Sequence, residues 1–167
     1  MTTRRMIGMI VCILTVLGSA ILAQQIKPPK VEQKIILVSG NKDWTNTGFT
    51  VFPKDRVTVK ASGKVYFSDG AMESGVGPEG WARDNYAAAF PEDANYCDDP
   101  LMSENHAALI ADINNERFLL GPETTFHGKD GLFYVGINDC SFAGSFFNSG
   151  QFSLVIKIER NVVPDKK

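Results

Sequence analysis

The stretch from Gly131 to Ile158 constrains the fold more than any other part of the sequence. It holds two apolar runs separated by a polar loop that opens on Asp139 and closes on Asn148. The first run is apolar on both faces, which is typical of a strand deep in a sheet. The second has apolar residues at alternate positions, the period of a half-buried strand: Phe152, Leu154, Ile156 and Ile158. We therefore expect two neighbouring strands with Asp139 and Asn148 at the same end.

The rest of the chain repeats this pattern of short strands and turns. Runs rich in apolar and β-branched residues, bounded by glycine, proline and asparagine, are typical of strands. They occupy residues 34–38, 44–51, 56–61, 64–67, 106–113, 118–120 and 124–127. Many short strands with turn signals between them predict an all-β fold, either a sandwich or a barrel.

One segment, residues 68–105, departs from this pattern. It is rich in glycine, proline and acidic residues, and a loop of this length within a compact domain is uncommon. A solvated insertion and a binding role are both open for it. Within it, Arg83 to Phe90 carries three alanines that favour a turn of helix.

The N-terminus has the pattern of a secretory signal peptide. Arg4 and Arg5 precede an apolar run that ends in small residues near position 23, as in cleaved signals. A membrane anchor is the alternative, since the run approaches the length of a spanning helix. We expect a signal peptide (1–23), an extended lead-in (24–33), one β-sandwich domain (34–160) and a polar tail (161–167). The protein would then be exported, periplasmic or secreted, without stable membrane insertion after cleavage.

The charge balance excludes some partners. The chain has 17 basic and 19 acidic residues, and removal of residues 1–23 takes away Arg4 and Arg5, leaving 15 against 19. A net negative charge does not favour binding to nucleic acid or to an anionic membrane, since both attract basic surfaces.

Two cysteines, Cys97 and Cys140, remain after the signal peptide. An even number in an exported protein favours a disulfide between them. A structural zinc site requires more Cys or His in close spacing than His106 and His127 supply.

Several segments together resemble the PA-IL-like family of bacterial galactophilic lectins. The resemblance covers about residues 34–158, and its segments appear in the family's order. They are Trp44-x-x-Thr47-Gly48-Phe49-x-Val51, Asp55-Arg56-Val57-Thr58-Val59-x-Ala61-Ser62-Gly63, Gly77-Pro78-Glu79-Gly80, the strand from Ala107 to Ile113, Asn138-Asp139 and Asn148-Ser149-Gly150-x-Phe152. The resemblance implies a single antiparallel β-sandwich of the jelly-roll or galactose-binding-like type.

The resemblance also implies a calcium ion at one end of the sandwich, completed by two hydroxyl groups of a galactose-type sugar. Asp139 matches the metal-binding aspartate and Asn148 the second loop asparagine. Backbone carbonyls near Phe67 and near Gly144 or Ser145 would complete the protein ligands.

Two positions depart from the family pattern. Phe147 stands where the family has its first loop asparagine. Asp84 stands in the register of the family's sugar-contacting histidine. Acids beside Cys97, above all Asp98 and Asp99, could replace the missing ligand if the disulfide brings them close.

The sequence thus predicts a non-catalytic carbohydrate-binding protein that uses calcium, with Asp139, Asn148, Asp84 and Trp81 at the sugar. Trp81 is included because an aromatic ring in a loop can stack on a sugar face. No nucleophile elbow is present, and we expect no enzyme. The alternative is a non-catalytic envelope or interaction domain with a degenerate metal site, since Asp and Asn are also common turn residues. A homo-oligomer is compatible with either reading.

Overall fold

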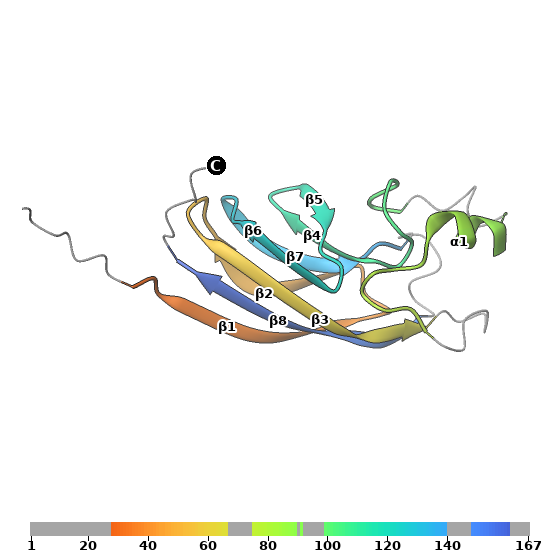
Figure 1. The fold of residues 1–167 in the computed structure, drawn as a ribbon, viewed down its shortest axis with the longest axis horizontal. Helices are drawn as coiled ribbons and strands as arrows, with labels where there is room; N and C mark the ends of the chain where they lie inside the picture. Colours follow the sequence, from red (N-terminus) through yellow and green to blue (C-terminus); the bar gives the residue numbers. More distant parts are fainter. Residues whose placement is uncertain (1–27, 67–74, 90, 92–98, 140–147, 161–167) are drawn as a thin grey trace, which may run out of the picture.

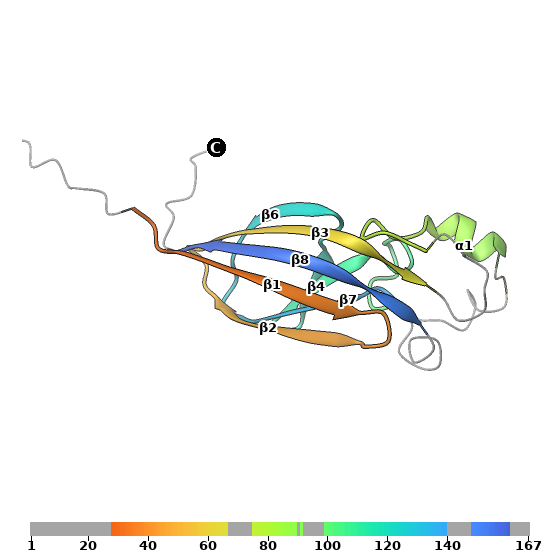
Figure 2. The ribbon, with the colours of Figure 1, turned by 90° about the horizontal axis from the view of Figure 1, so that it is seen from below.

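The computed structural model describes residues 28–66, 75–89, 91, 99–139 and 148–160. Two four-stranded antiparallel sheets pack face to face, with strand orders β1-β8-β3-β6 and β2-β7-β4-β5 (Figures 1 and 2). The strands are β1 (Val31–Ser39), β2 (Trp44–Val51), β3 (Arg56–Tyr66), β4 (Leu109–Ile113), β5 (Glu116–Leu119), β6 (Glu123–His127), β7 (Gly131–Ile137) and β8 (Ser149–Glu159), and one helix, α1 (Arg83–Ala89), is described. The predicted β-sandwich is confirmed.

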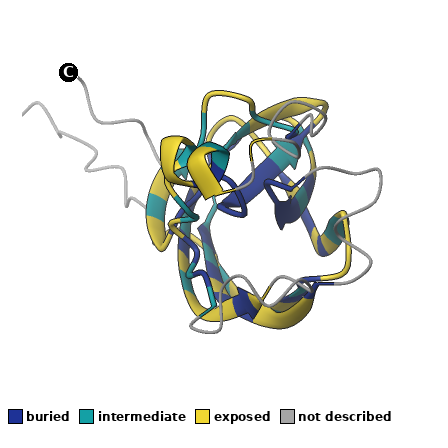
Figure 3. Cartoon of the chain, turned by 90° about the vertical axis from the view of Figure 1, so that its right-hand side faces the viewer, coloured by how far each residue is buried: buried dark blue, intermediate teal, exposed yellow. Residues whose placement is uncertain are grey.

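The core lies between the two sheets and is built from alternate residues of their central strands. All four alternating apolar residues of β8 are fully buried, as are Phe133 and Val135 of β7. Buried and exposed segments alternate along the strands when the molecule is seen from the α1 side (Figure 3). The predicted depth of β7 is confirmed, because it lies between β2 and β4.

Two strands are longer than the sequence indicates. β1 begins at Val31 rather than Lys34, because its pairing with β8 continues to Glu159. β3 runs without interruption through the turn expected at Ser62-Gly63. Gly63 has a φ of +104° there, and a Cβ would collide with the carbonyl oxygen of Gln151. The glycine therefore admits a close approach of β8 instead of reversing the chain.

Two core assignments were wrong in part. The strand expected from His106 begins at Leu109, because Ala107 has a positive φ of 58°, outside the β region that a non-glycine strand residue occupies. Of the run expected to be buried at 118–120, Phe118 and Leu119 belong to the edge strand β5, so Leu119 is 40% exposed, and only Leu120, which follows β5, is buried. The helical turn expected from Arg83 is present as α1.

The expected signal peptide and tail lie outside the described residues, and both stay predictions. None of the helices in the described part of the chain has the length and apolar character of a membrane span.

An ion-pair cluster joins β1, the turn before β3 and the end of β8. Arg160 donates from Nη1 to Asp55 at 2.6 Å and from Nη2 to Glu32 at 3.1 Å. It also donates to the carbonyl oxygen of Thr50 at 2.8 Å. The hydrogen bond from Arg160, with a second from Lys30, lowers the pKa of Glu32 to about 2 from 4.5. Folding therefore stabilises the ionised form of the Glu32 carboxyl group relative to its protonated form.

This cluster predicts an acid-dependent loss of stability. A group whose pKa is depressed by folding stabilises the protein above its unfolded pKa, and that contribution is lost as pH falls. For Glu32 the loss falls between about pH 5 and pH 2. We expect Glu32→Gln to be less stable than wild type at pH 7 and to lose less stability on acidification, measured by urea unfolding at each pH. Glu123→Gln, which removes an exposed ion pair with Lys60, is the control. Parallel pH profiles for wild type and Glu32→Gln would contradict the prediction.

Candidate functional site

The site lies at the end of the sandwich beside α1, where β7 ends and β8 begins (Figure 1). Asp139 follows β7 and Asn148 precedes β8, and both side chains are buried. Asn148 Nδ2 donates a hydrogen bond to Asp139 Oδ2 at 2.5 Å. The predicted convergence of these two residues is confirmed.

The route by which they converge differs from the prediction. β7 and β8 are not neighbours in one sheet but belong to opposite sheets. Each strand is central in its own sheet, so both its edges are already paired with other strands. Asp139, from one sheet, and Asn148, from the other, therefore meet at the end of the sandwich.

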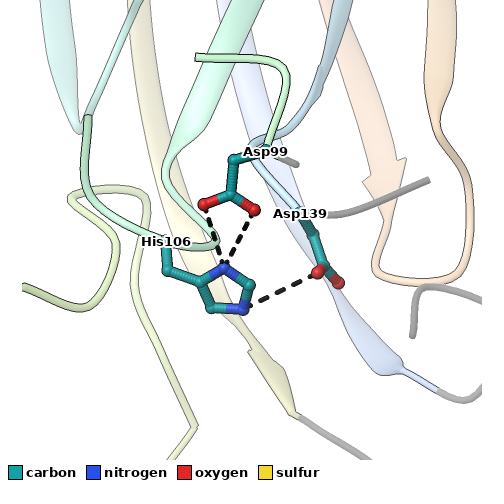
Figure 4. Close-up of side chains that lie close together, drawn as sticks. All are labelled: Asp99, His106 and Asp139. Atoms are coloured by element: carbon teal, nitrogen blue, oxygen red, sulfur yellow. Dashed lines mark hydrogen bonds and ion pairs between the residues drawn. The ribbon is translucent and has the colours of Figure 1, made fainter. Parts of the chain in front are cut away.

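His106 lies between Asp139 and a second aspartate, Asp99 (Figure 4). Its Nδ1 is 3.2 Å from both carboxylate oxygens of Asp99. Its Nε2 is 3.6 Å from Asp139 Oδ1. All three side chains are buried, with His106 2% exposed. Ligand atoms of the three residues lie within 4.8 Å of one another, an arrangement that could hold a metal ion.

Aromatic residues and a cation fix this cluster from the α1 side. Tyr86 of α1 stacks on the His106 ring with centroids 3.8 Å apart. Arg83, the first residue of α1, donates to Asp99 Oδ2 at 3.0 Å. The imidazole plane is therefore held by Tyr86, and one Asp99 oxygen already has a cationic partner.

The segment carrying Asp99 and His106 is held in place by Asn138. The Asn138 side chain is fully buried. Its Oδ1 accepts from Leu101 N at 2.8 Å, and its Nδ2 donates to the carbonyl oxygens of Leu101 and Asn105, each at 3.0 Å. Asn138 thus forms hydrogen bonds with three backbone groups of a segment that lies outside the strands. It joins the residue before Asp139 to the loop that supplies the other two members of the cluster.

The other predicted sugar-contacting residues lie differently from expectation. Trp81 is half-buried against the core, and its backbone N donates to the His106 carbonyl oxygen at 2.7 Å. Its ring meets Tyr86 edge-on, with centroids 5.8 Å apart. Asp84 is exposed in the first turn of α1, and no contact among the described residues joins it to Asp139 or Asn148. Trp81 therefore packs between the core and Tyr86, next to the cluster.

Several predicted residues lie outside the described part of the chain. They are the metal-ligand candidates Phe67 and Gly144 and the cysteines Cys97 and Cys140. The disulfide therefore stays a prediction.

His106 is the site residue that the sequence did not assign. The sequence placed it at the start of the run 106–113 and gave it no ligand role. The sequence feature that pointed to this cluster was the pair of acids beside Cys97, which could approach Asp139. Asp99 does so, with His106 between the two carboxylates, whereas Asp98 lies outside the described residues.

These residues fit a calcium ion only in part. Calcium is bound by oxygen ligands such as carboxylates, amide oxygens and backbone carbonyls. Asp139 and Asn148 offer ligands of that kind. The imidazole of His106 does not, because nitrogen ligands suit zinc and other transition metals.

Comparison with known proteins supports the fold. No protein-family model and no curated protein matches the chain. A solved structure described as "EclA N-terminal domain; PllA-like lectin" is similar, with a TM-score of 0.50 and 19% sequence identity over 75% of this chain and 95% of that one. At this identity the likeness shows a shared fold. The PA-IL-like assignment itself stays a hypothesis.

Proposed function

We propose that this chain is an exported, non-catalytic carbohydrate-binding domain of lectin type. Its recognition site would be the end of the sandwich where Asp139 and Asn148 meet. The observation that carries the proposal is the contact of these two buried polar side chains across the two sheets. The similarity in fold to a lectin domain supports the same reading.

Calcium is the cation that we propose for this site. Asp139 would supply a charged ligand and Asn148 a neutral one. Asn148 now turns its Nδ2 toward Asp139, and rotation of the amide group would place its oxygen on the same side. A bound calcium ion would offer open coordination positions to neighbouring sugar hydroxyls, which are neutral oxygen ligands of the kind that it accepts.

A second candidate function is a non-catalytic interaction domain whose metal site has degenerated. Two observations favour it. His106 Nε2 faces Asp139 where calcium would require oxygen. Phe147 stands at the position where the resemblance implies an asparagine.

Thermal unfolding with calcium and with a chelator separates the two functions. A ligand that binds only the folded state stabilises it, by about 2.7 kcal/mol at a concentration one hundred times Kd. We expect calcium to raise Tm by several degrees and a glycan array to give chelator-sensitive signals. Asn148→Ala should reduce the calcium response, whereas Asn46→Ala, an exposed asparagine, should not. A Tm that calcium does not change would favour the interaction domain.

A further inference from the structure

The geometry points to a second cation preference at this end of the sandwich. We propose that a zinc-class divalent cation binds between His106 Nε2 and Asp139 Oδ1 and competes with calcium for Asp139. The proposal shares Asp139 with the function proposed above but does not depend on carbohydrate binding.

The first argument is the orientation of the imidazole ring. Asp99 lies at Nδ1 of His106, 3.2 Å from each carboxylate oxygen (Figure 4). A carboxylate accepts hydrogen bonds, so this contact assigns the proton to Nδ1. In the neutral ring Nε2 then carries the lone pair, and it faces Asp139. Histidines that bind metals commonly use one nitrogen while a carboxylate holds the other in this way.

The second argument is the distance between His106 Nε2 and Asp139 Oδ1. It is 3.6 Å, longer than the roughly 2.7–3.2 Å of an N–H···O hydrogen bond. Two ligands that bind one tetrahedral zinc ion at about 2.0–2.2 Å lie about 3.3–3.5 Å apart. The separation therefore suits a shared ion better than a direct hydrogen bond.

The third argument is the rigidity of the His106 ring. The Tyr86 ring stacks on the His106 ring at an interplanar angle of 18°. The backbone of His106 is fixed by an isolated β-bridge to Trp81. The charge of Asp99 is already paired with Arg83. Asp99 therefore orients the His106 ring, and the negative charge next to Nε2 comes from Asp139. His106 and Asp139 would be ligands of the ion, and Asp99 would be a positioning residue.

The competing explanation is a proton. A doubly protonated His106 would form an ion pair with both aspartates and would need no metal. The two explanations make opposite predictions for a zinc titration, because a proton on Nε2 blocks the metal ligand.

Isothermal titration of the purified, chelator-treated protein with zinc chloride, without calcium or sugar, tests the proposal. Any free thiols are first alkylated, so that Cys97 and Cys140 cannot bind the metal whether or not the expected disulfide has formed. We expect one zinc ion per chain. His106→Asn keeps an amide donor near Asp99 but removes Nε2, and it should weaken binding at least tenfold. His127→Asn, which changes the other histidine of the chain, should leave binding unchanged.

Nitrogen NMR of the imidazole rings gives a readout that does not depend on a variant. Zinc should shift Nε2 of His106 while Nδ1 stays protonated, and Asp99→Asn should lower zinc affinity about tenfold. Added zinc should also weaken the response to calcium. Absence of zinc binding in wild type, or equal binding in wild type and His106→Asn, would overturn the proposal. Because the titration contains neither calcium nor sugar, its outcome is independent of the proposed carbohydrate binding.

Discussion

Asp139→Asn is expected to abolish the response of this protein to divalent cations. The carboxylate is the charged ligand proposed for calcium and faces His106 Nε2, so its removal takes away the negative charge on which either cation depends. The wild-type stabilisation of about 2.7 kcal/mol at one hundred times Kd should disappear. Thermal unfolding with calcium, with zinc and with chelator measures this directly.

The same substitution should leave the fold intact. An asparagine side chain keeps the size of Asp139 and an oxygen that can accept from Asn148. The far-ultraviolet circular dichroism spectrum and the unfolding midpoint in chelator should therefore stay close to wild type. Asp112→Asn, at an aspartate in β4 that pairs with Arg117, is the matched control. A full calcium response in Asp139→Asn would exclude the proposed site.

Asn138→Ala should cause the largest loss of stability expected for a polar residue of this end. The substitution removes three hydrogen bonds to the backbone of Leu101 and Asn105. A hydrogen bond contributes about 1 kcal/mol net, so the free energy of unfolding should fall by about 3 kcal/mol. Urea unfolding gives the total, and hydrogen exchange should show the greatest loss of protection in residues 99–108.

Asn138→Asp provides a sharper version of this test. It has the same shape but turns an oxygen toward the two carbonyl oxygens that Asn138 Nδ2 now contacts, so it should be at least as destabilising as alanine. Asn46→Ala is the control, because Asn46 is an exposed residue of β2. A change below about 0.5 kcal/mol in Asn138→Ala, the range of ordinary surface substitutions, would show that the loop does not depend on this side chain.

The proposed cation site connects both predictions. Asn138 holds the segment from Leu101 to Asn105, which lies between Asp99 and His106 in the sequence. Loosening that segment should also reduce zinc affinity, because the ring of His106 would lose its fixed direction. In the proposed site Asp139 would act at the ion, and Asn138 would act through the position of His106.

Part of the candidate site could be predicted from local patterns. Asp139 follows a run that is apolar on both faces and Asn148 precedes a run with alternating apolar residues, so their position at strand ends follows from the sequence. Asp84 and Trp81 could not be placed in this way, because α1 turns Asp84 to solvent and Trp81 packs against the core. The position of His106 between Asp99 and Asp139 was not predicted, because its surroundings are set by contacts distant in sequence.

The sequence by itself determined the β-rich class, the core face of β8, and the two polar residues at the ends of the loop between β7 and β8. These properties are local, since alternation along a strand fixes which side chains are buried. Only the tertiary structure decided that β7 and β8 lie in opposite sheets and that His106 lies between Asp99 and Asp139. Those features depend on which strands pair within each sheet and on the hydrogen bonds of Asn138. Such contacts join residues distant in sequence, so they produce no periodic pattern that could be recognised in the chain.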